Sequence, residues 1–266
     1  MKKFWIGIIV AATIVTGCQK REVDNETQSA TDNADAEMRY SSVPTIVNQI
    51  GLDEEGVEKD ALGVCATVNI TPSNSSDGYP KTVEVDYGTG CSDMDGRTRS
   101  GILNLVFSRP WSEDDVTVSV SFDNFVEGGV EYFGALSLTK SINASSNKVF
   151  TITLTDGRLV HSNGDVVEYE TTRSIEQTAG ITTVDTSDDI YVLTGSAKGV
   201  SKAGRAFTTS ITEPLKREMS CAYIATGVFE LTPDGLATRR VDFGDGTCDN
   251  MATVTINENE FEIELP

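Results

Sequence analysis

The chain has 266 residues, with 21 Lys and Arg against 41 Asp and Glu, and a formal net charge of −20. A protein this acidic repels phosphate backbones, and nucleic-acid binding depends on basic patches, so nucleic-acid partners are excluded. The length is sufficient for one large folded unit or for two smaller fused ones.

The N-terminus has the pattern of an export signal. Lys2 and Lys3 precede an apolar run over 4–15, and small residues follow this run. A positive end, an apolar core and a small-residue cleavage site are typical of a secretory signal peptide. The run is shorter than the roughly 18–20 residues that span a bilayer. We therefore expect residues 1–17 to be a signal peptide.

Val15-Thr16-Gly17-Cys18 resembles the bacterial lipobox, in which an aliphatic and two small residues precede a lipidated cysteine. The resemblance implies a diacylglyceryl group on the Cys18 sulfur and cleavage that makes Cys18 the new N-terminus. Two or more acyl chains anchor a protein stably to a membrane. Gln19 differs from the Asp that resembles an inner-membrane retention signal. We expect a lipid anchor in the cell envelope, at the outer membrane, on either its periplasmic or its surface face.

The segment after the lipobox is acidic and poor in large apolar residues. Cleavage would leave 19 basic against 41 acidic residues, a net charge near −22. A segment that cannot bury apolar surface gains too little free energy to offset the conformational entropy that ordering would cost. Residues 18–43 are therefore predicted to be a flexible acidic tether, and 44–266 a β-rich domain, with a short helix within 44–62.

If Cys18 is lipidated, four of the five cysteines remain. An even number suits disulfide formation in an oxidising compartment. These four cysteines delimit two related stretches, 65–91 and 221–248. In each, an aspartate lies 21 residues and a glycine 23 residues after the first cysteine, and an Asp-Gly pair lies about halfway. This agreement indicates an internal duplication. Each copy is predicted to be one hairpin closed by its own disulfide, which gives the pairs Cys65–Cys91 and Cys221–Cys248.

The two matching aspartates, Asp86 and Asp242, end an alternating strand pattern in each copy. We interpret them as buried carboxylates that accept backbone amide hydrogen bonds. Each disulfide would contribute roughly 3–3.5 kcal/mol in the chain-entropy model.

The rest of the chain has the composition of β-strands separated by turns. Gly128-Gly129, Asp156-Gly157 and Asn163-Gly164 are typical turn signals. The segments rich in β-branched and aromatic residues are 101–108, 116–125, 129–140, 148–155, 188–199, 205–212 and 251–265. Their pattern predicts an all-β fold, an antiparallel meander or sandwich. The duplicated hairpins lie near its two ends, so the domain could comprise two related halves, about 65–140 and 148–266.

A family resemblance points the same way. The stretch 214–265, with its Asp-aromatic-Gly-x-Gly-x-Cys-Asp block, is similar to a set of uncharacterised bacterial lipoproteins. The similarity extends through 85–108 and 120–139. It implies an exported β-rich lipoprotein, and it brings no activity, substrate or cofactor.

Catalytic and metal-binding motifs are weak. His161 has Ser162 and Asp165 beside it, but catalytic triads are assembled from separate segments, so we interpret it as a satisfied or solvated turn residue. The acidic turns at 93–96 and 245–250 offer oxygen ligands to calcium. They lack the third acidic position and the terminal Glu of an EF-hand, so bonding to their own backbone is the expected role. No cofactor is predicted.

Trp111 is the one tryptophan outside the signal peptide. Exposed on a loop, it could contact a glycan or a protein partner, but packing over the sheet edge is the favoured interpretation. The preferred hypothesis is a non-enzymatic, membrane-anchored β-domain that binds or scaffolds an unidentified envelope protein or glycan. A glycan- or cation-binding accessory lipoprotein is the alternative, and a carboxylate-based hydrolase is a third.

Overall fold

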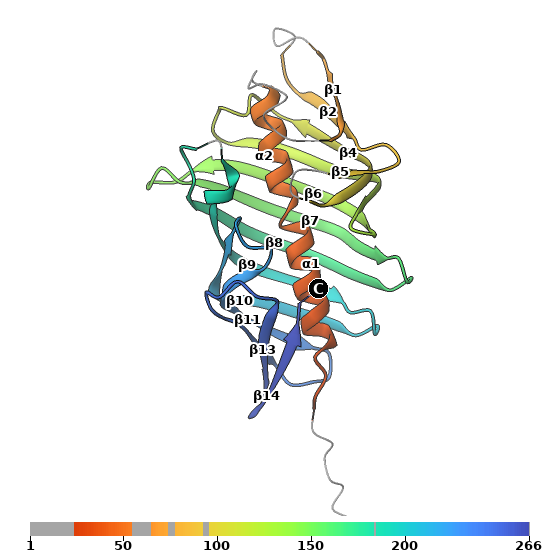
Figure 1. Cartoon of the computed structure of the whole chain (residues 1–266), viewed down its shortest axis with the longest axis vertical. Coiled ribbons are helices and arrows are strands. Elements are labelled where there is room, and N and C mark those ends of the chain that lie inside the picture. Colours follow the sequence, from red (N-terminus) through yellow and green to blue (C-terminus); the bar gives the residue numbers. More distant parts are fainter. Residues whose placement is uncertain (1–23, 55–64, 74–77, 93–95, 184, 266) are drawn as a thin grey trace, which may run out of the picture.

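The computed structural model describes residues 24–54, 65–73, 78–92, 96–183 and 185–265. Within these residues the chain begins with two helices and continues as a single 14-stranded antiparallel sheet (Figure 1). The predicted all-β antiparallel meander is therefore confirmed. The signal peptide and Cys18 lie outside the described residues, so cleavage and lipidation stay predictions.

Each strand pairs with its neighbours in the chain, with one exception. The two-residue β3 pairs with β4 beside the main path, and β2 therefore also pairs with β4. The strands are β1 (Thr67–Thr71), β2 (Lys81–Asp86), β3 (Cys91–Ser92), β4 (Thr98–Phe107), β5 (Val116–Glu127), β6 (Val130–Ile142), β7 (Lys148–His161), β8 (Val166–Ala179), β9 (Ile190–Val200), β10 (Ala206–Glu218), β11 (Ile224–Pro233), β12 (Arg239–Asp245), β13 (Met251–Ile256) and β14 (Asn259–Glu264).

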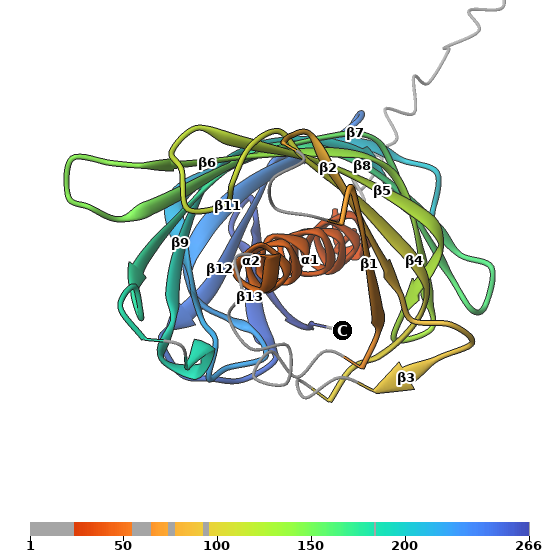
Figure 2. The same ribbon diagram turned by 90° about the horizontal axis from the view of Figure 1, so that it is seen from above.

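The sheet curls around the two helices. Viewed from above, α1 (Gln28–Tyr40) and α2 (Val43–Glu54) lie end to end inside the curve (Figure 2). Only Ser41 and Ser42 separate them. The Ser41 and Ser42 hydroxyls donate to the carbonyls of Met38 and Arg39, which satisfies carbonyl groups that the end of α1 leaves unpaired.

The described part of the predicted tether is thus not a flexible linker. From Gln28 onward it is a helix whose Asp32, Asp35 and Glu37 are each 4% exposed. The composition argument failed because it assumed that only apolar side chains can dock a segment. Here the sheet supplies partners for the acidic side chains. The helix predicted within 44–62 is present as α2.

The core lies between the helices and the concave face of the sheet. Inward residues alternate with outward ones along the strands, as in β2, where Val83 and Val85 are fully buried and Thr82 is exposed. β6 and β7 pair from Ile142↔Lys148 to Val130↔His161, with one register shift between Phe133 and Ala135. The two halves suggested by the sequence therefore belong to one sheet.

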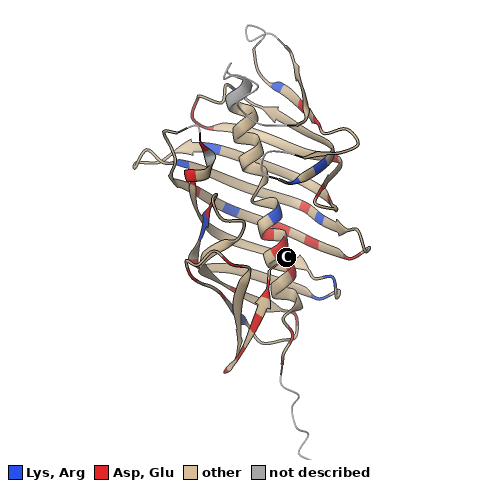
Figure 3. Ribbon diagram, viewed as in Figure 1, with Lys and Arg blue, Asp and Glu red and all other residues tan. Residues whose placement is uncertain are grey.

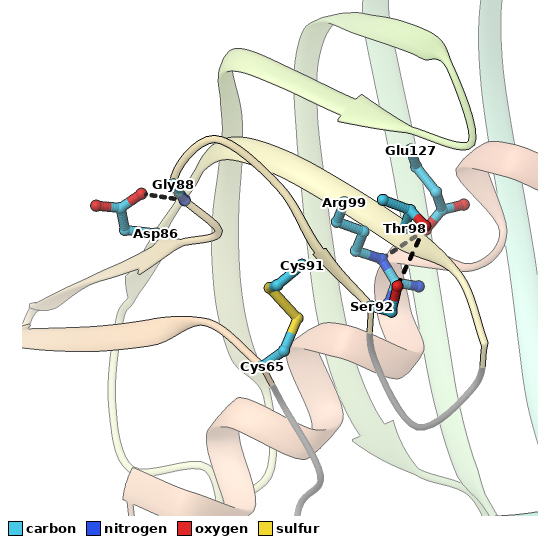
Figure 4. Close-up of a disulfide and its surroundings, with 8 residues drawn as sticks. All are labelled: Cys65, Asp86, Gly88, Cys91, Ser92, Thr98, Arg99 and Glu127. Atoms are coloured by element: carbon cyan, nitrogen blue, oxygen red, sulfur yellow. Dashed lines mark hydrogen bonds and ion pairs between the residues drawn. A yellow bond between two sulfur atoms is a disulfide. The ribbon is translucent and has the colours of Figure 1, made fainter.

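Both predicted disulfides, Cys65–Cys91 and Cys221–Cys248, are present in the structure. Figure 4 shows the first, which joins the chain just before β1 to β3. The second joins the segments that precede β11 and follow β12. Both sit beside comparable three-strand units, β1–β2–β4 and β11–β12–β13, near the ends of the sheet.

Candidate functional site

A groove of about 1010 Å³ lies on the surface of the described residues. One row of directly paired residues crosses its floor, in the order Phe133, Arg158, Glu168, Val200 and Ala206. These residues alternate with side chains that are buried against the helices. The groove therefore opens on the outer face of the sheet, opposite α1 and α2. We call it the outer groove.

A second row and a turn complete the outer groove. Two residues further along the strands, Glu170 pairs with Lys198, which pairs with Thr208. The turn between β11 and β12 adds residues 234–236 at one side. Val200, Ala206 and Leu236 provide apolar surface, and charged side chains stand among them.

Two glycines between these rows allow the strands to approach closely. A Cβ on Gly157 would lie 2.1 Å from the Tyr169 carbonyl oxygen, and one on Gly199 would lie 2.7 Å from Cζ of Phe207. Register shifts also occur in β6 after Phe133 and in β7 before Gly157. Bulges bend strands and strengthen their twist. They account for a hollow on a face that would otherwise be convex.

The Asp156-Gly157 pair is a typical turn signal, but it lies inside β7 and not in a hairpin turn. Asp156 has a φ of +52° at this bulge, a left-handed conformation that Asp tolerates better than most residues. Gly128-Gly129 and Asn163-Gly164 do lie in turns between strands.

Two polar contacts stand in the outer groove. The Arg158 guanidinium lies 4.1 Å from the centre of the Phe133 ring, and Lys198 Nζ lies 2.9 Å from Glu170 Oε2. The Lys198 and Glu170 side chains are 65% and 40% exposed. Because both side chains are exposed, both are accessible to a charged ligand. An exposed pair of this kind also contributes little to stability.

Behind the outer groove, β8 contacts helix α1 through a buried ion pair. Arg173 Nε lies 2.9 Å from Glu37 Oε2, and the Tyr169 hydroxyl donates to the same carboxylate. Burial tends to lower the pKa of Arg173, but the charge of Glu37 outweighs it and raises that pKa. Burial, with the Glu37 charge, raises the pKa of the Tyr169 hydroxyl. The strand that carries Glu168 and Glu170 is thereby fixed to α1.

Other charged residues of α1 also have partners. The Asp32 carboxylate accepts a hydrogen bond from the Lys202 backbone amide at 2.9 Å. Burial raises the pKa of Asp32 despite this bond. Asp35 pairs with Arg39 at 2.7 Å, one turn further along the helix. Polar contacts with β8 and with the turn after β9 therefore dock α1.

Trp111 is not available to a glycan or a protein. Its side chain is buried at 2% exposure, stacks on Phe150, and donates from Nε1 to Asn48 at 3.2 Å. Its ring fills the space beside Gly51, where a Cβ would lie 2.4 Å from Cγ of the indole. The possible ligand contact at Trp111 is therefore wrong, and the favoured packing role is present, between the sheet and α2.

His161 is a satisfied residue at the end of β7. Its Nε2 lies 3.3 Å from Oδ2 of Asp35 on α1, and its side chain is 25% exposed. This contact joins it to the helix rather than to Ser162 or Asp165 as a catalytic group.

The matching aspartates accept amide hydrogen bonds, as expected. Asp86 accepts from Gly88 at 2.7 Å (Figure 4), and Asp242 accepts from Gly244 at 2.9 Å. Both are only partly buried, so the predicted burial is wrong. Burial tends to raise the pKa of Asp242, but the Gly244 amide and the Arg240 charge lower it overall.

The acidic turns bond to their own backbone. Asp245 accepts from the Thr247 amide at 3.2 Å, and Asp249 accepts from the Met251 amide at 3.0 Å. Residues 93–95 of the other turn lie outside the described residues. Among the described residues, no three His, Cys, Asp or Glu side chains are grouped as a metal site requires.

Sequence reasoning missed the outer groove. Its lining comes from six consecutive strands, β6 to β11, and the two Asp-Gly pairs in it, 156–157 and 234–235, were interpreted only as turn signals. The available signal was the Asp-Gly pair inside an otherwise unbroken strand pattern, which also indicates a bulge.

No protein-family model, curated protein or solved structure matches this chain. The function has to be inferred from its own residues. Within the part that the structure describes, no helix has both the length and the apolar character needed to cross a membrane.

Proposed function

We propose that this chain is a lipid-anchored protein of the bacterial envelope whose β-sheet domain binds a ligand in the outer groove, without catalysing a reaction. The observation that carries the proposal is the groove itself. About 1010 Å³ is the size of a small-molecule site, and apolar surface with a few placed charges is the usual composition of one.

The chemistry of the outer groove favours an elongated ligand with apolar and charged parts. Val200 and Ala206 offer apolar contact across the middle of the floor. Arg158 and Lys198 can meet an anionic group, and Glu168 a cationic one. The ligand would exchange the exposed Lys198–Glu170 pair for its own ion pairs at little cost, because that pair is solvated.

Filling the outer groove tests this proposal. Ala206 is exposed in the middle of the floor, so Ala206→Trp would occupy the groove without entering the core. The anionic aromatic dye anilinonaphthalene sulfonate serves as the probe, since its rings suit the apolar floor and its sulfonate suits Arg158 or Lys198. We expect dye fluorescence to rise with wild-type protein, and its affinity to fall at least tenfold with Ala206→Trp.

Ser210→Trp is the matched control. Ser210 is exposed on the same strand and the same face, outside the groove. It should leave dye binding unchanged. Equal binding by wild type and both variants would contradict a ligand site in the outer groove. If the groove variants support the site, native mass spectrometry of wild-type protein purified from envelopes would identify its natural ligand.

The lipid anchor is tested separately from the groove. Cells grown with labelled palmitate should label the wild-type protein, and Cys18→Ala should abolish the label and release the protein from membranes. Label retained by Cys18→Ala would contradict the lipid-anchor part of the proposal. It would leave ligand binding to be decided by the groove variants.

A further inference from the structure

The sheet ends in two edge strands that differ in charge. Among the described residues, β1 pairs only with β2 and β14 pairs only with β13. Figure 1 shows these two edge strands at opposite ends of the molecule. β14 presents the exposed Glu260, Glu262 and Glu264, whereas β1 has no charged residue, no proline and no register shift. Charges, prolines and bulges are the usual protection of an edge strand against pairing with another chain. β14 is therefore protected, and β1 is not.

The second three-strand unit shows what the edge of β1 looks like when it is occupied. In that unit β11 holds the position of β1, and the edge of β11 that corresponds to the free edge of β1 pairs with β10 in antiparallel orientation. Phe229 and Leu231 on β11 point toward the core and are 2% and 0% exposed. On the next strand, β12, Phe229 pairs with Val241.

The corresponding residues of β1 are less completely buried. Val68 pairs with Val85, which precedes Asp86 as Val241 precedes Asp242. Val68 and Ile70 both pack against the core, yet both remain half-buried. By comparison with β11, the first unit lacks one strand beside β1.

The sequence of β1 indicates which strand fits there. Thr67-Val68-Asn69-Ile70-Thr71 is nearly a palindrome, with an asparagine at its centre, a β-branched aliphatic residue on each side and a threonine at each end. Antiparallel pairing of two copies about Asn69 places Thr67 opposite Thr71 of the second copy, a favourable cross-strand pair. It also places Val68 opposite Ile70 of the second copy on the inner face, where each covers the other.

We propose that two copies of this protein associate through β1, in antiparallel register about Asn69, so that their two sheets become continuous. Backbone hydrogen bonds along the edge provide the affinity, as in other cases of strand addition. The contact is two-fold symmetric and therefore closes at a dimer. Pairing of β1 with β14 of the next copy would be head-to-tail, and β1 has no cation to meet the glutamates of β14. Five residues bury little area, so the association is weak and reversible.

Sedimentation equilibrium of the mature full-length protein tests the association. The salt concentration is about 0.3 M, which screens the repulsion between two acidic copies. We expect the weight-average mass to rise with protein concentration from that of one copy toward that of two. A mass that stays at one copy up to the highest soluble concentration would overturn the proposal, and so would a mass that exceeds two copies.

Asn69→Lys gives β1 the protection that it lacks. Asn69 is exposed, so the variant should fold as wild type does, which circular dichroism checks. Two lysines opposite one another disfavour the pairing, and we expect the dissociation constant to rise at least fivefold. Ser119→Lys is the matched control, with the same change of charge at an exposed position three strands from the edge. It should dimerise as wild type does. Equal dissociation constants for the two variants would overturn the proposal.

A cross-link tests the register directly. Residues directly opposite one another across two strands have Cβ atoms about 5 Å apart, so Asn69→Cys should form a disulfide-linked dimer on mild oxidation, seen on a non-reducing gel. Glu262→Cys, at an exposed position on β14, is the control and should stay monomeric. Failure of Asn69→Cys to cross-link would overturn the proposed register. A mixed dimer between the two variants would overturn the symmetric contact in favour of head-to-tail pairing.

Discussion

Helices α1 and α2 lie end to end against the same concave sheet, yet they dock by opposite means. The residues that α1 buries include Asp32, Asp35 and Glu37, whereas α2 buries Ile46 and Ile50. Figure 3 shows charged positions along α1 and none on the tan part of α2. The difference teaches that a buried position need not be apolar when the surface opposite it supplies charge and hydrogen bonds.

The sheet differs beneath the two helices in the matching way. Under α1 it presents Arg173 and Tyr169, which bind Glu37. Beside α2, Trp111 packs with its ring against Phe107 and Phe150. Ion pairs in a low-dielectric interior depend strictly on their partners, while apolar contacts depend on filled volume. The two helices should therefore respond differently to substitution and to pH.

The largest effect is expected from breaking the Glu37–Arg173 pair. Glu37→Met leaves Arg173 buried without its counter-charge, and should lower the free energy of unfolding by about 3–5 kcal/mol in urea titrations. The double variant Glu37→Met, Arg173→Met removes both charges and should recover most of that loss. A single variant as stable as wild type would show that α1 is not docked by this pair.

A somewhat smaller loss is expected from truncating the apolar contact of α2. Ile50 is 1% exposed, so Ile50→Ala should cost about 3 kcal/mol by leaving a cavity. The cost should be the same at pH 5 and pH 8, because no titrating group is involved. Gln49→Ala, at the half-buried position next to it, is the control and should cost less than about 0.5 kcal/mol. A pH-dependent cost for Ile50→Ala would contradict the contrast between the helices.

The smallest effect is expected from Asp32→Asn, and its sign depends on pH. Burial raises the pKa of Asp32 in the folded state. The folded protein therefore keeps this proton after the unfolded chain has lost it, and stability falls as pH rises from the ordinary value of 3.8 through the raised one. Asparagine can still accept from the Lys202 amide and does not titrate.

Asp32→Asn should therefore be within about 1 kcal/mol of wild type at pH 7, and its stability should lack this fall in the acid range. Urea titrations at several pH values between 3 and 6 measure it. An identical pH profile for the two proteins would show that Asp32 does not titrate abnormally in the folded state.

Much of the fold was predictable from local pattern. Alternation along β2 and β7, and the turns at Gly128 and Gly164, follow from the geometry of strands and from the backbone freedom of glycine. The two disulfides followed from the duplicated spacing, because a hairpin returns its second cysteine close to its first. These features depend on residues close together in the chain.

The candidate site was not predictable in the same way. The outer groove depends on bulges at Phe133 and Gly157 whose effect appears only when six strands are placed side by side. Trp111 shows the same limit. The sequence favoured packing at a sheet edge but left exposure on a loop open, and only the position of α2 beside it makes the indole a core residue.

By itself the sequence determined the all-β class, the strand alternation and the pairing of Cys65 with Cys91 and of Cys221 with Cys248, and it predicts export and a lipid anchor. Tertiary structure alone decided that the acidic segment becomes the buried helix α1 and that a groove forms behind it. The physical reason is distance along the chain. Strand periodicity depends on adjacent residues. The charge that stabilises the buried Glu37 carboxylate comes from Arg173, 136 residues further along the chain.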